Sequence, residues 1–180
     1  MDGFHQLQPH PDAPPSRVKS VLVALVRLAP DKIHLRYMVW APVDELALPD
    51  PADPERADGL WKTTCFEFFV RGQNSSYDEY NFSPSSRWAA YNFSSYRQSA
   101  SPLPLAADPH IGLSAATDLF NMEVVLTAAA EILGPVSLTA VIEEEDGTKS
   151  YWALAHPPEG PPDFHHPSCF VLELPPPSAP

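Results

Sequence analysis

Most of the 23 prolines in this chain fall into five short segments, and this distribution constrains the fold more than any other feature. The segments lie near the two termini and at residues 42–54, 102–109 and 157–167. Proline has no backbone N–H to donate to a β-ladder, so it is excluded from central strands. The stretches between these segments are therefore where a sheet can form.

The proline-poor stretches have the composition of β-strands. They are rich in Val, Ile, Leu, Thr and aromatic residues, and turn-forming sequences such as Pro30-Asp31 separate them. Nine short strands without alternating helices predict an all-β fold, a two-sheet antiparallel β-sandwich of immunoglobulin-like or jelly-roll type. The alanine-rich segment Leu126–Leu133 is expected to add one short helical turn. The predicted strands are residues 17–29, 32–40, 63–71, 77–83, 87–93, 118–127, 136–145, 149–156 and 168–174.

The length of the chain predicts one domain, because 180 residues bury a single core and the 44% apolar share supplies it. We expect residues 1–15 to be a disordered proline-rich N-terminus. Residues 16–174 form the predicted β-sandwich, and residues 175–180 a proline-rich tail.

Charge and composition exclude several classes of partner. A formal net charge of −12 disfavours binding to a phosphate backbone. The chain has no apolar run of the roughly 18 residues that cross a bilayer, and its first residues lack the features of a signal peptide. We therefore expect a cytoplasmic protein that binds neither nucleic acid nor membrane. Cys65 and Cys169 are expected to be reduced, since two cysteines make no disulfide framework.

Strand alternation predicts which side chains share a face. In residues 63–71, Phe66, Phe68 and Val70 form the core face, so Glu67 projects from the opposite face. A concave sheet face with flat rings and polar groups suits a sugar, whose apolar C–H face stacks on rings while its hydroxyls bind carboxylate, amide and guanidinium groups. The candidate stacking residues are Trp61, Trp88, Tyr91 and Trp152, and the candidate hydrogen-bonding residues are Glu67, Glu79, Asn81, Arg97 and His156.

Other interpretations of these residues remain open. In a purely structural interpretation, Trp88 and Tyr91 cover core edges, and Glu67 or Glu79 pairs with Arg97 as an internal structural polar group. His156, with Asp163 and His165, could bind a metal ion or haem iron, although the spacing matches no standard zinc signature. A further alternative is an enzyme acting on a sugar or cell-wall precursor, with one glutamate as acid or base.

Two segments carry a family resemblance. Leu60–Phe69 (LWKTTCFEFF) and Tyr77–Tyr91 (YDEYNFSPSSRWAAY) resemble the bacterial DOMON-like proteins related to family 9 carbohydrate-binding modules. The closing segments Ser150–Pro157 and Pro162–Pro167 look like the C-terminal signature of the same group. Together the matches span about Val18 to Leu174.

The resemblance implies a β-sandwich whose relatives bind sugars or haem on one concave face or at one sandwich end. By position, Trp61 matches the tryptophan before the family's core acidic strand, Glu67 matches its acid, and Asn81 and Arg97 match polar positions that follow. Haem-binding DOMON domains use a Met and His pair, and no methionine here can be placed opposite His156 or His165 by motif. We therefore expect a non-catalytic domain that binds a small molecule, a carbohydrate or sugar derivative, with no cofactor.

Overall fold

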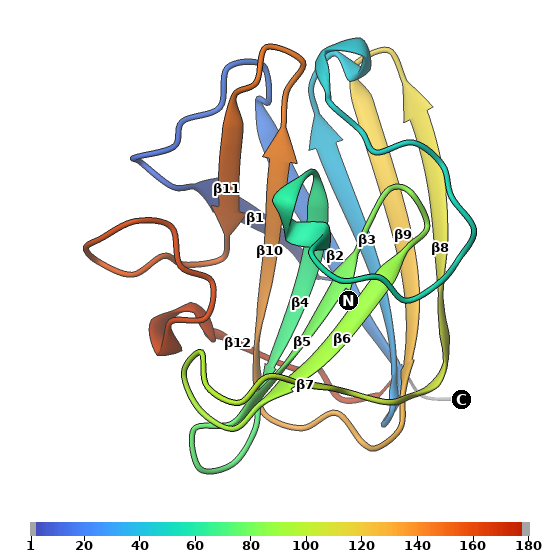
Figure 1. Cartoon of the computed structure of the whole chain (residues 1–180), viewed down its shortest axis with the longest axis vertical. Helices are drawn as coiled ribbons and strands as arrows, with labels where there is room; N and C mark the ends of the chain where they lie inside the picture. Colours follow the sequence, from blue (N-terminus) through green and yellow to red (C-terminus); the bar gives the residue numbers. More distant parts are fainter. Residues whose placement is uncertain (1–2, 178–180) are drawn as a thin grey trace.

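The computed structural model describes residues 3–177, and these residues form an all-β molecule with three short 3-10 helices (Figure 1). Within this range no helix is long and apolar enough to cross a bilayer. The predicted all-β class is thus confirmed. In chain order the elements are β1 (Gly3–Pro9), β2 (Ser20–Ala29), β3 (Lys32–Trp40), η1 (Val43–Glu45), η2 (Leu60–Lys62), β4 (Cys65–Arg71), β5 (Tyr77–Phe82), β6 (Trp88–Phe93), β7 (Ser101–Pro102), β8 (Leu105–Ala116), β9 (Leu119–Ala128), β10 (Pro135–Glu143), β11 (Lys149–Ala153), η3 (Pro167–Cys169) and β12 (Leu172–Glu173).

The strands pair antiparallel in one continuous sheet that is curled into two layers. The first layer has the order β1-β2-β3-β9-β8, and the second has the order β7-β6-β5-β4-β10-β11, with β12 paired to β10. Strand β1 belongs to both layers, because Gly3 to Leu7 pair with β2 while Gln8 and Pro9 pair with β11. This geometry is that of the predicted sandwich.

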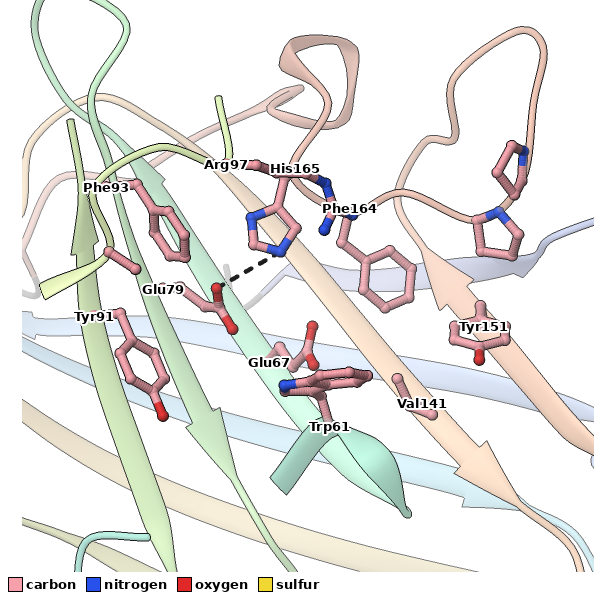
Figure 2. A pocket seen from close by; sticks show the side chains of 13 residues that line it. Trp61, Glu67, Glu79, Tyr91, Phe93, Arg97, Val141, Tyr151, Phe164 and His165 are labelled. Carbon is pink, nitrogen blue, oxygen red and sulfur yellow. Dashed lines mark ion pairs between the residues drawn. The ribbon is translucent and has the colours of Figure 1, made fainter. Parts of the chain in front are cut away.

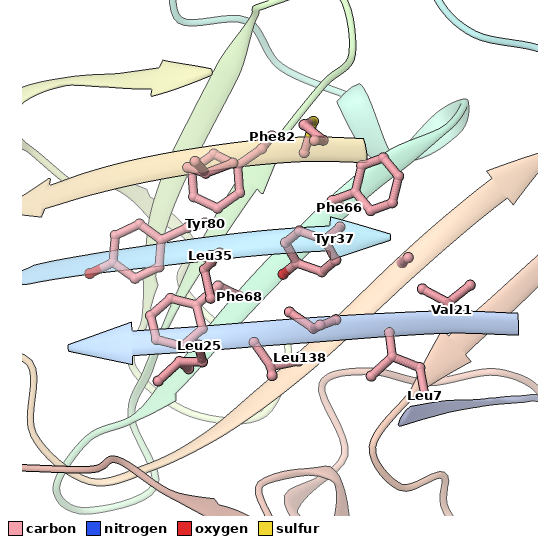
Figure 3. Close-up of a cluster of buried hydrophobic side chains, with 14 of the residues drawn as sticks. Leu7, Val21, Leu25, Leu35, Tyr37, Phe66, Phe68, Tyr80, Phe82 and Leu138 are labelled. Carbon is pink, nitrogen blue, oxygen red and sulfur yellow. The ribbon is translucent and has the colours of Figure 1, made fainter. Parts of the chain in front are cut away.

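The main core lies between the two layers. Alternate side chains of β2 and β3, such as Val21, Leu25 and Leu35, face Phe66 and Phe68 of β4 across the gap (Figure 3). Burying one such side chain contributes roughly 1.5–3 kcal/mol. The predicted core face of residues 63–71 is confirmed by this arrangement.

A second apolar cluster lies on the outer face of the second layer. Phe69 of β4 and Tyr77 of β5 pack there against Phe164 and Phe170 in one cluster. Both of these phenylalanines come from the segment after β11, which returns across this face. The outer face of the second layer is therefore partly covered, and this cover forms one wall of the site described below.

The N-terminal segment differs from its predicted disorder. Gly3–Pro9 forms a strand, because Leu7 is fully buried in the core and the backbone finds partners in both layers. Its proline sits at the last position of the strand, where chain direction changes. Of the two predicted tails, residues 1–2 and 178–180 lie outside the described residues.

Two further segments differ from prediction. Leu126–Leu133 is not helical: its first three residues complete β9, where Leu126 is buried and pairs with Ile33, and the remainder is irregular. Leu105–Ala116 forms β8 although it contains Pro109. This strand lies at a sheet edge, and its pairing with β9 shifts register around the proline, so no ladder hydrogen bond from that position is required.

Candidate functional site

A cavity of about 610 Å³ opens on the outer face of the second layer (Figure 2). Its walls come from η2, from strands β4, β5, β6, β10 and β11, and from two loops, residues 94–100 and 157–166. Five aromatic side chains and four polar ones line it. The aromatic residues are Trp61, Tyr91, Phe93, Tyr151 and Phe164, and the polar residues are Glu67, Glu79, Arg97 and His165.

Strand alternation and register bring the two glutamates together. Glu67 lies between the core residues Phe66 and Phe68, so its side chain points to the outer face. Its cross-strand partner is Asn81, and Glu79 lies two residues before Asn81 in β5, on the same face. Glu67 is only 3% exposed and Glu79 only 5%. The floor of the cavity therefore carries two almost fully buried carboxyl groups.

The Glu67 carboxyl has an environment that favours its protonated form. Its Oε2 accepts a hydrogen bond of 3.0 Å from the Thr139 hydroxyl. Burial, and then the nearby charge of Glu79, raise the pKa of Glu67 well above its usual value and outweigh the opposing effect of Thr139.

The Glu79 carboxyl is held closer to ionisation. Burial raises its pKa to about 6, while the hydrogen bond from Asn81 Nδ2, 2.7 Å from Glu79 Oε1, and the charge of Arg97 act in the opposite direction. Both pKa values are raised, so the pair holds a proton to a higher pH than two separate exposed carboxyl groups would. Such a pair both accepts and donates hydrogen bonds.

His165 presents a neutral imidazole to the cavity. Burial is the main cause that lowers the pKa of His165 to about 4. Its Nδ1 lies 2.7 Å from the Tyr77 hydroxyl, which stays protonated because burial raises the pKa of Tyr77 to about 12. This hydroxyl oxygen already accepts the Arg97 backbone N–H at 3.1 Å, so we assign its proton to the bond with Nδ1. The imidazole proton is thereby assigned to Nε2. Nε2 lies 3.8 Å from Glu79 Oε2 (Figure 2), too far for a hydrogen bond and, with a neutral ring, not a salt bridge at neutral pH.

Asp163 connects the two loops at the rim. Its carboxylate accepts hydrogen bonds from Arg97 Nη2 (2.8 Å), from the Tyr96 hydroxyl (2.6 Å) and from the backbone N–H of His165 (3.1 Å). Burial alone would raise the pKa of Asp163, but the bonds from Tyr96 and Arg97 outweigh it and lower this pKa. The Arg97 charge is consequently paired with Asp163.

Five of the predicted site residues line the cavity, and Asn81 supports it from below. Asn81 is buried and reaches the site through its bond to Glu79. The five that line the cavity are Trp61, Glu67, Glu79, Tyr91 and Arg97.

Three predicted binding residues lie elsewhere. Trp88 of β6 pairs with Phe82 of β5, and both side chains face the core. The Trp88 ring therefore packs inside the sandwich, on the opposite face of β6 from Tyr91. Trp152 is also in the core, where its Nε1 donates to the Ser150 hydroxyl at 2.8 Å. His156 does not line the cavity: its Nε2 lies 2.8 Å from the carbonyl oxygen of Gln8.

The alternative metal set is not assembled. Asp163 is engaged by Arg97 and Tyr96, His165 by Tyr77, and His156 by the N-terminal strand. Among residues 3–177, no three His, Cys, Asp or Glu side chains are grouped as metal ligands.

Sequence reasoning missed several walls of the cavity. Phe93 shares a strand face with Tyr91, and Tyr151 alternates with the core residue Trp152, so alternation could have identified both. Phe164 belongs to a loop, and no periodic signal indicates which face this loop covers.

Comparisons with known proteins support the fold. No protein-family model matches the sequence, and no curated protein matches it. Solved structures with a similar fold include a candidate carbohydrate-binding protein from Bacteroides uniformis, with a TM-score of 0.62, 16% identity, and coverage of 94% of this chain and 84% of that one. They also include a family 9 carbohydrate-binding module from Caldicellulosiruptor kristjanssonii in complex with cellotriose, with a TM-score of 0.50, 9% identity, and coverage of 86% and 73%.

At such low identity the likeness concerns the fold alone. The chain shares the architecture of family 9 carbohydrate-binding modules, as the resemblance in Leu60–Phe69 and Tyr77–Tyr91 implied. Membership of the DOMON-like group stays a prediction.

Proposed function

We propose that this protein binds a carbohydrate in the cavity on the outer face of the second layer. The observation that carries the proposal is the meeting of ring faces and buried carboxyl groups in one open cavity, above all Trp61 and Tyr91 beside Glu67 and Glu79. Rings accept the C–H face of a pyranose, and carboxyl groups bind its hydroxyls. The shared fold with carbohydrate-binding modules supports the same function.

The polar groups suit hydroxyl recognition. The carboxyl oxygens of Glu67 and Glu79 accept hydrogen bonds, a proton held by the pair can be donated, and His165 donates through Nε2. His165 Nε2 and Glu79 Oε2 are 3.8 Å apart, so a ligand hydroxyl that lies beside both atoms can accept a hydrogen bond from the first and donate one to the second. A cavity of about 610 Å³ lies within the range of small-ligand sites, so we propose a mono- or disaccharide unit as the ligand.

Calorimetric titration against a panel of mono- and oligosaccharides tests the proposal. At least one sugar should bind, and Trp61→Ala and Glu67→Gln should each weaken that binding by about tenfold or more, equivalent to about 1.4 kcal/mol. The matched controls are Phe4→Ala, an aromatic residue that is 63% exposed on β1, and Glu123→Gln on the first layer, and both should bind normally. If no sugar of the panel binds, the result would contradict the proposal.

Recovery of the ligand after incubation separates binding from catalysis. We propose that the sugar is returned unchanged, because the site acts by stacking and hydrogen bonding. Chromatography of a long incubation checks this. Conversion of the sugar that disappears in Glu67→Gln and Glu79→Gln would instead favour the enzyme alternative.

A further inference from the structure

The carboxyl groups of the cavity have no cationic partner. Among the described residues, Arg97 is the single Lys or Arg side chain that lines it, and its Nη2 is committed to Asp163 at 2.8 Å. His165 is neutral for the reasons given above. Glu67 and Glu79 thus form an acidic pair without a Lys or Arg ion-pair partner among the described residues, and Arg97, bonded to Asp163, lowers the pKa of Glu79 only from a distance.

One oxygen of each carboxyl is left for a ligand. Glu67 uses Oε2 to accept from Thr139, and Glu79 uses Oε1 to accept from Asn81. Glu67 Oε1 and Glu79 Oε2 make no hydrogen bond to residues 3–177, although both side chains are at least nine-tenths buried and line the cavity. Neither oxygen is among the buried polar atoms that lack a partner, so both open into the cavity, where water or a ligand can donate a hydrogen bond to them.

Aromatic rings complete an environment suited to a cation. The face of an aromatic ring attracts positive charge, and groups of rings around a cavity recognise ammonium groups. Two rings of this cavity already attract cations of the chain itself: Lys62 Nζ lies 5.9 Å from the Trp61 ring centroid, and Arg56 Cζ lies 5.4 Å from that of Tyr91. Neither Lys62 nor Arg56 lines the cavity, so neither neutralises the glutamates.

We infer that the carbohydrate bound here carries a protonated amino group, as a hexosamine does, with its ammonium placed against Glu67 Oε1 and Glu79 Oε2. This inference rests on the proposed function and specifies the class of its ligand. A uronic acid would meet like charge on the cavity floor, and a neutral sugar would leave the acidic pair without compensation.

Proton release should accompany binding of such a ligand. An ammonium stabilises the ionised form of both glutamates, so their pKa values fall and a proton held by the pair is released. The other groups that face the pair keep their protonation state near neutral pH, because burial raises the pKa of Cys65 and Tyr91, His165 is already neutral, and Arg97 stays charged. Affinity should therefore rise with pH until the amine of the ligand itself loses its proton.

The test is calorimetry of the full chain with glucosamine, glucose, N-acetylglucosamine and glucuronic acid, in two buffers of different ionisation enthalpy. Glucosamine should bind about tenfold or more tightly than glucose and N-acetylglucosamine, with net proton release at about pH 6. Glu67→Gln and Glu79→Gln should remove most of this preference, and the control Glu123→Gln should retain it. These substitutions keep side-chain size, and circular dichroism checks that each variant is folded.

The outcomes separate this inference from the proposed function. Glucose binding as tightly as glucosamine would overturn the inference while leaving carbohydrate binding intact. Methylammonium serves as a probe for the charge alone. If methylammonium binds to the wild type but not to Glu67→Gln, and no sugar binds, the result would support cation recognition and overturn the carbohydrate function. If none of the sugars and no methylammonium binds, the result would overturn both the inference and the proposed function.

Discussion

At the scale of single residues, Glu79 links the site to the stability of the protein. It is buried beside Glu67, and its hydrogen bond from Asn81 only partly offsets the cost of burial. A carboxyl group that is buried at a cost in folding stability is typical of a functional site, where recognition of a ligand takes precedence over stability. The same cost predicts a measurable dependence of stability on pH.

Glu79→Gln should make the protein more stable at neutral pH. Burial raises the pKa of Glu79 from 4.5 to about 6, so the stability contributed by its protonated form is fully present below about pH 4.5 and is lost as pH rises through 6. The loss amounts to about 2 kcal/mol, which the uncharged Gln avoids. Urea unfolding should show the variant about 2 kcal/mol more stable than the wild type at pH 7 and nearly equal to it at pH 4.

Glu123→Gln is the control with the opposite sign. Hydrogen bonds from Arg36 lower the pKa of Glu123, so its contribution is present above the ordinary pKa and is lost as pH falls through the lowered value. This exposed variant should be slightly less stable than the wild type at pH 7. A stability difference for Glu79→Gln that does not change with pH would contradict the assignment of the burial cost to the carboxyl charge.

At the scale of elements, β1 joins the two layers of the sandwich. It closes the sandwich by pairing with both layers, and Leu7 at its centre is 0% exposed, whereas Phe4 three residues earlier is 63% exposed. Strand alternation thus places Leu7 on the face that packs in the core and Phe4 on the face that is exposed to solvent.

Leu7→Ala should destabilise the protein by about 3 kcal/mol, because it removes a buried side chain and leaves a cavity between the layers. Phe4→Ala, on the same strand, should change stability by no more than about 0.5 kcal/mol. Chemical unfolding of both variants measures the difference. Equal and small effects would mean that β1 is not part of the cooperative core.

The loops at residues 94–100 and 157–166 form a second functional pair of elements. Prolines at positions 161 and 162 line the cavity, and a proline-rich loop loses less conformational entropy on ordering than an ordinary loop does. What holds this loop in place is the Asp163 carboxylate, through Arg97 and Tyr96.

Asp163→Ala should release the covering loop without unfolding the sandwich. We expect faster amide hydrogen exchange in residues 157–166 and unchanged protection in β3 and β9, together with several-fold weaker ligand binding. Asp146→Ala is the control, since this aspartate accepts a hydrogen bond from the Thr148 N–H in the turn between β10 and β11. Its effect on exchange should stay in that turn. Loss of protection throughout the molecule in Asp163→Ala would contradict a local role.

At the scale of the whole molecule, the two layers differ in what lies on their outer faces. The outer face of the first layer carries a surface ion pair between Arg36 and Glu123, whereas the second layer carries the cavity beneath the C-terminal segment. The formal net charge of −12 gives the protein a negative field, which attracts cations to this cavity and repels anions.

The binding of a cationic sugar should therefore depend on salt. Raising the ionic strength from about 0.01 M to about 0.15 M shortens the Debye length from about 30 Å to about 8 Å and screens the distant acidic residues. Glucosamine affinity should fall several-fold over this range, while the affinity of any bound neutral sugar should not change. Calorimetric titration at both salt concentrations measures this, and salt-independent glucosamine binding would contradict a role for the overall charge.

Strand positions and strand faces follow from the sequence, and the site follows only in part. Proline spacing located most of the strands but missed β1 and β8, which contain Pro9 and Pro109. Alternation correctly put Phe66 and Phe68 in the core and Glu67 outside, because this pattern depends on local backbone geometry. The same alternation opposed Trp88 to Tyr91, so Trp88 could have been excluded from the site.

The tertiary structure alone decided which distant segments meet. The pairing of β1 with both layers, the return of Phe164 and His165 across the second layer, and the Arg97–Asp163 contact depend on contacts between residues far apart in the chain. Such contacts leave no period in the sequence, since their energy depends on shape and burial in the assembled fold. The chain thus specified its strands and faces locally, and only folding joined two glutamates, five rings and a covering loop into one cavity.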